Sequence, residues 1–124
     1  MAITLSTTLR NARADAITTN AGATAKLTVY TAAYGAVLYT ATCSATLAGA
    51  ASGGVLTFNA VGNATATGAG TAAIARLFKS DGTTMVIEGL TVGTSGTNII
   101  ITNTTIAVND VITTSSATIT EGNP

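Results

Sequence analysis

Residues 71–92, TAAIARLFKSDGTTMVIEGLTV, contain two apolar runs on either side of a short polar turn. Asp81-Gly82 favours a two-residue hairpin turn, because aspartate and glycine tolerate the positive φ that such a turn needs. The sequence therefore predicts an antiparallel hairpin with this pair at its tip. The predicted cross-strand pairs are Lys79 with Thr84, Phe78 with Met85, Leu77 with Val86, and Arg76 with Ile87.

This hairpin carries apolar side chains on both faces. In the predicted register Phe78, Met85 and Ile87 share one face, and Leu77 and Val86 share the other. A hairpin of this kind cannot be fully wetted on either side. We expect one face to pack on the core and the other to meet a neighbouring subunit.

The rest of the chain after Gly22 shows the same two-residue alternation, interrupted by turn residues. Short β segments with frequent turns are typical of an antiparallel β-sandwich or jelly roll. The fold class is therefore predicted to be mainly β. The main expected strands lie in residues 26–31, 34–47, 55–60, 71–79, 83–92, 98–108 and 111–120, with a weaker one in 63–68.

One α-helix is predicted, over residues 6–20. Ser6 is a good N-cap and Gly22 a good stop. The apolar residues at helical spacing form a narrow stripe that we expect to dock on the sheet. They are Leu9, Ala12, Ala16 and Ile17. The whole chain, 1–124, is predicted to be a single domain, with 1–22 as an N-terminal helical arm and 23–124 as the sandwich.

The chain is poor in charge: 8% of its residues are charged, the formal net charge is zero, and ordinary domains have about 25%. A freely soluble monomer of this kind would lack colloidal repulsion, so we expect self-association or another partner to cover much of the surface. The neutral balance predicts no nucleic-acid partner. No apolar run is long enough for a membrane span. MAITLSTTLR lacks the pattern of a secretory signal, so synthesis in a reducing cytoplasm is expected.

The sequence predicts no enzyme, no cofactor and no metal site. It has no histidine, the side chain most used for proton transfer near neutral pH and a common metal ligand. Its carboxylates show no local paired spacing, and no phosphate-binding glycine loop is present. Cys43 is expected to be a small buried hydrophobe. Tyr30, Tyr34 and Tyr39 could form a sugar-binding platform, although packing in the core or at an interface is the favoured interpretation.

Nearly the whole chain resembles a group of small virion proteins of tailed bacteriophages and prophages. The resemblance is carried by ITLSTTLRNARADAIT (3–18), KLTVY (26–30), ASGGVLTFNA (51–60), ATGAGTAAIARLFKSDGTTMV (66–86) and VGTSGTNIIITNTTIAVNDVITTSSATIT (92–120). The chain departs from the group at Ala75, where an aromatic residue often precedes the arginine, and in its alanine-rich middle. None of these segments is a catalytic signature.

The resemblance implies a head decoration (cement) protein that binds the outer capsid shell. Such proteins are typically compact β-domains, often trimeric, that stabilise the capsid by bridging subunits of the major capsid protein. We therefore expect the virion surface as location, and the major capsid protein and further copies of this chain as partners. The alternatives are a tail, neck or fibre component, or a carbohydrate-binding adhesion module. The residues expected at the partner interface are Arg10, Arg13, Arg76, Leu77, Lys79 and Val86.

Overall fold

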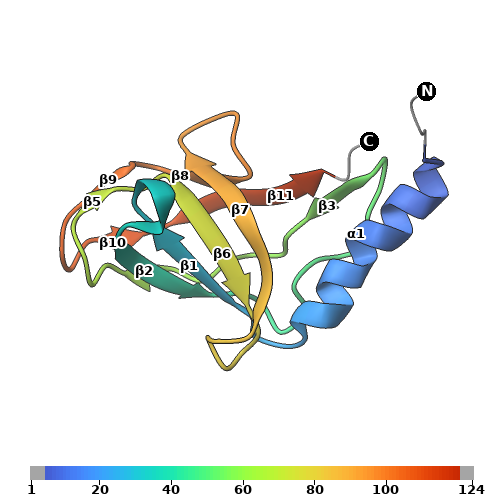
Figure 1. Ribbon diagram of the computed structural model, residues 1–124, viewed down its shortest axis with the longest axis horizontal. Helices are drawn as coiled ribbons and strands as arrows, with labels where there is room; N and C mark the ends of the chain where they lie inside the picture. The colour runs from blue at the N-terminus through green and yellow to red at the C-terminus, as the bar shows by residue number, and fades with distance from the viewer. Residues whose placement is uncertain (1–4, 121–124) are drawn as a thin grey trace.

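A computed structural model describes residues 5–120, which fold into a mainly β structure with one α-helix (Figure 1). The helical elements are α1 (Thr7–Ala21) and a short 3₁₀ turn, η1 (Ala32–Tyr34). The strands are β1 (Lys26–Tyr30), β2 (Val37–Thr42), β3 (Val55–Thr57), β4 (Ala64–Thr65), β5 (Gly70–Thr71), β6 (Ile74–Phe78), β7 (Met85–Gly93), β8 (Ile99–Ile101), β9 (Thr105–Ile106), β10 (Val111–Ile112) and β11 (Thr114–Thr120). The predicted fold class is confirmed.

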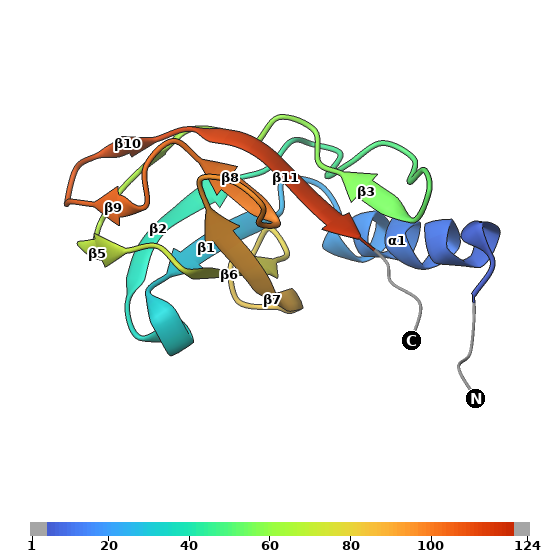
Figure 2. The ribbon, with the colours of Figure 1, turned by 90° about the horizontal axis from the view of Figure 1, so that it is seen from above.

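Seven strands form one sheet in the order β2-β1-β6-β7-β8-β11-β3, and β10-β4 and β5-β9 form two small sheets. The large sheet curls, so that β8 and β11 lie over β1 and β6 in two layers (Figure 2). The largest side chains with almost no exposed surface include Leu27, Tyr39, Leu77, Ile99 and Ile101. This core is built from Leu, Ile, Val and Ala with few aromatic rings.

One strand pair is parallel, where the sequence predicted an antiparallel fold. Val92 pairs with Ile99 in parallel register. Residues 94–98 connect the two strands, and the Asn98 side chain closes this loop. Its Oδ1 accepts from Thr91 N and from Thr91 Oγ1, both at 3.0 Å. This connection is far shorter than the crossover that parallel strands usually need, and hydrogen bonds between Asn98 and Thr91 tie its two ends together.

The predicted helix is present and begins as expected. The Ser6 hydroxyl accepts from Leu9 N at 3.2 Å. At the other end, Gly22 has φ of +70°, and its N–H donates to Thr18 O. These are a standard N-cap and a glycine stop with positive φ.

The face on which α1 docks differs from the predicted one. Ala14 and Ala21 are buried, whereas Leu9, Ala12 and Ala16 are exposed and Ile17 is half-buried. The expectation that the stripe of Leu9, Ala12, Ala16 and Ile17 meets the sheet is wrong for its first three members.

Backbone donors in the 48–54 loop explain this orientation. Asn11 Oδ1 accepts from Gly54 N at 2.8 Å, and Asp15 Oδ1 accepts from Ala51 N at 2.7 Å. Partly buried amides need acceptors, and the small Ala14 side chain permits close approach. The polar face of α1 therefore binds this loop, and the apolar stripe is left outside.

The β6–β7 hairpin keeps the predicted register near its tip and loses it further along. Lys79 N donates to Thr84 O at 2.9 Å, and Phe78 pairs with Met85. Leu77 then pairs with Ile87 instead of Val86. An irregularity at Val86 shifts the register by one residue, so the predicted pairs Leu77–Val86 and Arg76–Ile87 are wrong.

The tip itself is wider than a two-residue turn. Gly82 N donates to Lys79 O at 2.9 Å, which closes a turn over residues 79–82. Gly82 has φ of +73°. Asp81 Oδ1 accepts from Thr83 N and Thr84 N, each at 2.8 Å. The aspartate stabilises this loop through its carboxylate as well as its backbone.

Candidate interaction surface

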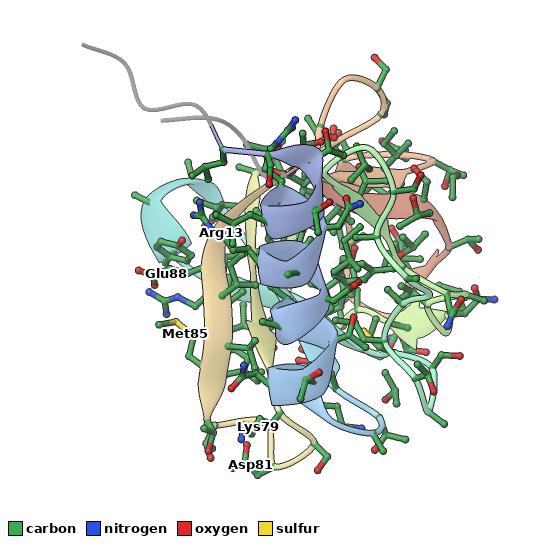
Figure 3. All side chains as sticks on the ribbon, turned by 90° about the vertical axis from the view of Figure 1, so that its right-hand side faces the viewer. Arg13, Lys79, Asp81, Met85 and Glu88 are labelled. Carbon is green, nitrogen blue, oxygen red and sulfur yellow. The ribbon has the colours of Figure 1, made fainter. Side chains whose placement is uncertain are left out.

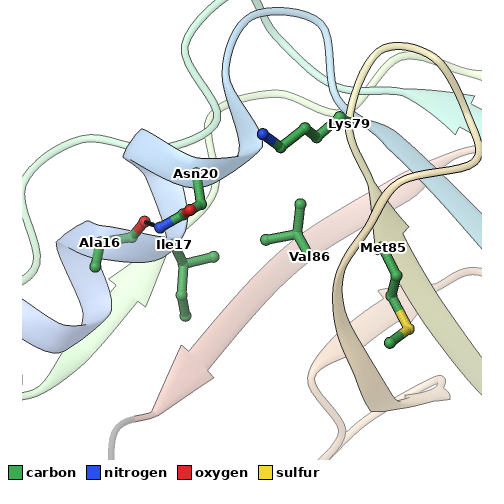
Figure 4. A pocket seen from close by; sticks show the side chains of 6 residues that line it. All are labelled: Ala16, Ile17, Asn20, Lys79, Met85 and Val86. Carbon is green, nitrogen blue, oxygen red and sulfur yellow. Dashed lines mark hydrogen bonds between the residues drawn. The ribbon is translucent and has the colours of Figure 1, made fainter.

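A groove of about 190 Å³ lies between α1 and the β6–β7 hairpin (Figure 4). We call it the helix–hairpin groove. Its lining residues are Ala16, Ile17, Asn20, Lys79, Met85 and Val86. Aliphatic side chains and Met85 dominate the lining, and the amide of Asn20 and the ammonium of Lys79 supply the polar groups.

The floor of the groove is the border of the core, and its surroundings are exposed. Ile17 and Val86 pack partly buried against the core and point toward each other (Figure 4). Met85 is 50% exposed, and Leu9, on the outward stripe of α1, is 47% exposed. The irregularity at Val86 keeps this side chain on the groove side of the hairpin. Leu9, Met85 and the apolar side chains of the groove thus form an apolar strip that nothing in the described chain covers.

Lys79 brings a positive charge to the groove. Its side chain extends from the hairpin toward the last turn of α1 (Figure 4), where backbone carbonyls carry partial negative charge. Within residues 5–120, the one ion pair seen between side chains joins Arg76 and Glu88. No carboxylate of the described chain neutralises Lys79.

The nearby acid, Asp81, is engaged in its own turn (Figure 3). Hydrogen bonds from the Thr84 hydroxyl and from the Thr84 and Thr83 amides lower the pKa of Asp81 to about 2. The carboxylate is therefore held ionised by donors of the hairpin loop.

A second cluster lies further along the same hairpin. The Arg76 guanidinium carbon lies 3.8 Å from the Tyr34 ring centroid and 5.3 Å from that of Tyr30. Arg76 Nε donates to Glu88 Oε2 at 3.2 Å. Desolvation lowers the pKa of Arg76, but the hydrogen bond with Tyr30 and the nearby Glu88 carboxylate and Tyr34 raise it above its ordinary value. We call these four residues the tyrosine–arginine cluster.

The cluster depends on an unusual backbone conformation. Ala33 and Tyr34 have φ of +57° and +56°, a region that side-chain-bearing residues rarely adopt. In this conformation the Tyr34 hydroxyl accepts from Gly89 N at 2.8 Å. Stacking and hydrogen bonding thus offset the strain of η1, and the polar groups of the cluster bind one another.

The six residues predicted at an interface do not come together. Lys79 and Val86 line the helix–hairpin groove. Arg76 belongs to the tyrosine–arginine cluster. Leu77 is fully buried in the core, so its prediction as an interface residue is wrong: the shift at Val86 separates the two side chains.

The two helical arginines point in different directions. The Arg10 guanidinium packs against Gly54, where an added Cβ would come within 2.5 Å of it. Arg13 lies on the exposed side of α1 (Figure 3). Arg10 therefore contributes to the contact between the helix and the loop.

Sequence reasoning missed Leu9, Ala16, Ile17 and Met85 as surface residues. The first three were recognised as an apolar stripe, but a docking helix was expected to bury it. The polar positions Asn11 and Asp15, four residues apart, were the available sign that the opposite face would bind backbone amides.

The described residues offer little reactive chemistry. No group of three or more metal-ligating side chains occurs within residues 5–120. Burial raises the pKa of the Cys43 thiol to about 11, although Lys26 lowers it. Burial also raises the pKa of Tyr39 to about 12. Both groups are kept in their neutral forms, which are poor nucleophiles.

Comparisons with protein families, with curated proteins and with solved structures return no match for this chain. Across the described part of the chain, no helix has the length and apolar character needed to cross a bilayer. A function is therefore proposed from the surfaces of the described residues together with the sequence resemblance given above.

Proposed function

We propose that this protein is a non-enzymatic structural component of a tailed-phage particle, which decorates the head and stabilises it by bridging subunits of the major capsid protein. The observation that carries the proposal is the uncovered apolar strip formed by Leu9 and the helix–hairpin groove, on a chain of which only 8% is charged. Such a surface suits burial against a protein lattice, where many weak contacts add up. The resemblance of nearly the whole chain to virion proteins points the same way.

The charged groups support this assignment by where they are engaged. Arg76 pairs with Glu88, Asp15 binds the 48–54 loop and Asp81 binds its own turn. Because these charges serve the chain's own structure, they are poorly placed to bind a charged substrate. Apolar contacts are left as the main means of binding a partner.

Strand addition is a weak alternative way to bind a shell. The edge of β2 is covered, since Thr67 N and Gly68 N donate to Leu38 O and Gly62 N donates to Thr42 O. The other edge strand, β3, has three residues. Short or covered edges disfavour pairing with another chain.

The carbohydrate-binding alternative loses its proposed platform. Tyr30 and Tyr39 are buried, and the ring of Tyr34 is covered by Arg76 at 3.8 Å. A sugar would need an open aromatic face to stack on. We therefore favour the structural role.

The heat resistance of phage particles tests this proposal. Phage particles lacking the protein are expected to lose infectivity and release DNA at lower temperature than complete particles, and added protein should restore their heat resistance. Equal heat resistance of both particles would refute the stabilising role.

Copy number separates a head protein from a tail component. Quantitative mass spectrometry of purified particles should give hundreds of copies for a head decoration protein. A count of about six or twelve would instead place the protein in the tail or neck, through the ring symmetries common there.

A further inference from the structure

We propose that two copies of this chain bind head to tail, with the turn between β9 and β10 of one copy seated in the helix–hairpin groove of the next. The occupant of the groove is thus a second copy, and the contact joins two different surfaces. The inference deepens the self-association that accompanies the proposed function. It concerns the purified chain, so it stands or falls separately from any role in a particle.

The turn over residues 107–111, here called the valine turn, exposes apolar side chains where polar ones are usual. Val108 is 53% exposed and Val111 is 66% exposed, the highest values among the large exposed hydrophobic residues of the described chain. Turn corners normally carry Gly, Pro, Asn, Asp or Ser. Two exposed valines within four residues, with the exposed carboxylate of Asp110 between them, form a compact apolar and acidic surface, and Asp110 and Val111 also line a hollow beside the turn.

The valine turn is held rigidly. Asp110 N donates to Ala107 O at 3.1 Å, and Ala107 N donates to Asp110 Oδ2 at 2.9 Å. Asn109 N donates to Ala66 O, and Ala66 N donates to Asp110 O, which fastens the turn to the residue that follows β4. A preorganised turn loses little conformational entropy on binding.

The groove and the turn complement each other in chemistry. The groove offers the aliphatic surface of Ile17 and Val86 together with Lys79, which no carboxylate of the described chain neutralises. The turn offers the two valines and Asp110, whose Oδ1 accepts no hydrogen bond from the described residues. Burying the valines against Ile17 and Val86 would bring opposite charges together at the edge of the contact, which favours this pairing over others.

The two surfaces lie at opposite ends of the molecule. The valine turn is at the end marked by β9 and β10, and α1 forms the other end (Figure 1). One copy therefore cannot satisfy its own groove. A contact between two different surfaces closes into a ring or continues as an open chain, according to the rotation between neighbours.

The experiment is sedimentation velocity of the purified protein over a concentration series up to roughly 1 mM, a range that detects weak association. Two variants block one surface each. Ala16→Glu places a carboxylate in the groove, where it neutralises Lys79 and repels Asp110. Val108→Asp removes an apolar contact from the turn. Each variant alone is expected to weaken association by roughly tenfold or more, since an acidic group then enters an apolar contact.

Mixing the two variants tests the head-to-tail geometry. The Ala16→Glu chain keeps an intact turn and the Val108→Asp chain keeps an intact groove, so an equimolar mixture should form a one-to-one dimer and nothing larger. A contact between identical surfaces would instead let one of the two variants associate like wild type on its own, and mixing would add no new dimer. That outcome overturns the proposal, as does a wild-type protein that stays monomeric throughout or two variants that associate like wild type.

Matched controls separate the effect from general acidity or misfolding. Ala12→Glu makes the same change on the exposed side of α1 outside the groove, and Val37→Asp changes an exposed valine outside the valine turn. Both should associate like wild type. Circular dichroism checks the fold, and if Val108→Asp is unfolded, Asp110→Asn replaces it because the amide oxygen can still accept from Ala107 N. Unchanged association of Asp110→Asn would then overturn the role of the charge pair and with it the proposal.

Groove binding to the particle is the remaining outcome. If the wild type is monomeric in solution and Ala16→Glu fails to bind particles lacking the protein, the groove receives a capsid segment and the self-contact is refuted. The proposed function would survive that result. Conversely, solution dimers with no effect on particles would refute the function alone.

Discussion

The two ends of the β6–β7 hairpin use their side chains in opposite ways. Toward the base, the tyrosine–arginine cluster joins Arg76 to Glu88 and to two tyrosine rings. Near the tip, the helix–hairpin groove leaves Val86 and Met85 without a cover. Each end carries two charged residues, but at the base they pair with each other, whereas at the tip apolar surface beside Lys79 is open.

This difference changes where a partner should be sought. In a chain with few charges, a cluster of charges invites interpretation as a binding site. The cluster here stabilises an unusual backbone conformation at η1, whereas the apolar strip has no structural partner in the described chain. Uncovered apolar surface is therefore the better guide to interaction in this protein.

The largest difference in stability is expected between Leu77→Ala and Val86→Ala, because Leu77 lies inside the core and Val86 lies at its border. Leu77→Ala removes a fully buried side chain and should cost about 2–5 kcal/mol of unfolding free energy. Val86→Ala, at a half-buried position, should cost about 1 kcal/mol. Urea denaturation of both variants measures this. Equal losses would mean that Val86 belongs to the core and that the groove is not a separate surface.

A smaller effect is expected at the closed end. Tyr34→Phe keeps the ring under Arg76 and removes the hydroxyl that accepts from Gly89 N, so it should destabilise the fold by about 0.5–1.5 kcal/mol. Thermal denaturation of the variant measures this change. A stability equal to that of wild type would show that the hydroxyl does not secure η1.

Tyr39 provides the contrast within the same residue type. Its hydroxyl is buried and has no hydrogen-bond partner among the described residues. Tyr39→Phe should therefore leave stability unchanged or raise it by up to about 1 kcal/mol. Loss of stability in the same denaturation assay would indicate a bonded hydroxyl.

The smallest effect concerns pH at the hairpin tip. The folded pKa of Asp81, about 2, lies below the unfolded value of about 3.9. Its ionised form thus stabilises the fold above pH ~4, and this contribution is lost as the pH falls toward 2. The melting temperature of wild type should exceed that of Asp81→Asn at pH 6, and the gap should narrow between pH 4 and 2. A gap independent of pH would contradict the assignment.

Much of the fold could be predicted from local pattern. Two-residue alternation indicated the strands, Ser6 and Gly22 marked the helix ends, and the Ser80-Asp81-Gly82 turn placed the β6–β7 hairpin with the correct register at Lys79 and Phe78. These features depend on neighbours in sequence, so sequence reasoning finds them.

What failed depends on contacts distant in sequence. The irregularity at Val86 shifted the pairing, so that Val86 lines the groove while Leu77 is buried in the core. No local sequence signal in the hairpin indicates this irregularity. The helix turned its polar face inward because Asn11 and Asp15 meet amides of the 48–54 loop. The parallel β7–β8 pair was missed for a different reason: residues 93–96 indicate a turn, but not the direction of the strand that follows. The interface prediction inherited these errors, because it assigned surface positions from the predicted register and charge.

The central claim is that apolar surface at the open end, and not the charge cluster, mediates association. The most direct measurement compares the sedimentation of wild type, Ala16→Glu and Arg76→Gln over the same concentration series. We predict that Arg76→Gln associates like wild type, whereas Ala16→Glu remains monomeric. Loss of association in Arg76→Gln with full association of Ala16→Glu would contradict the account.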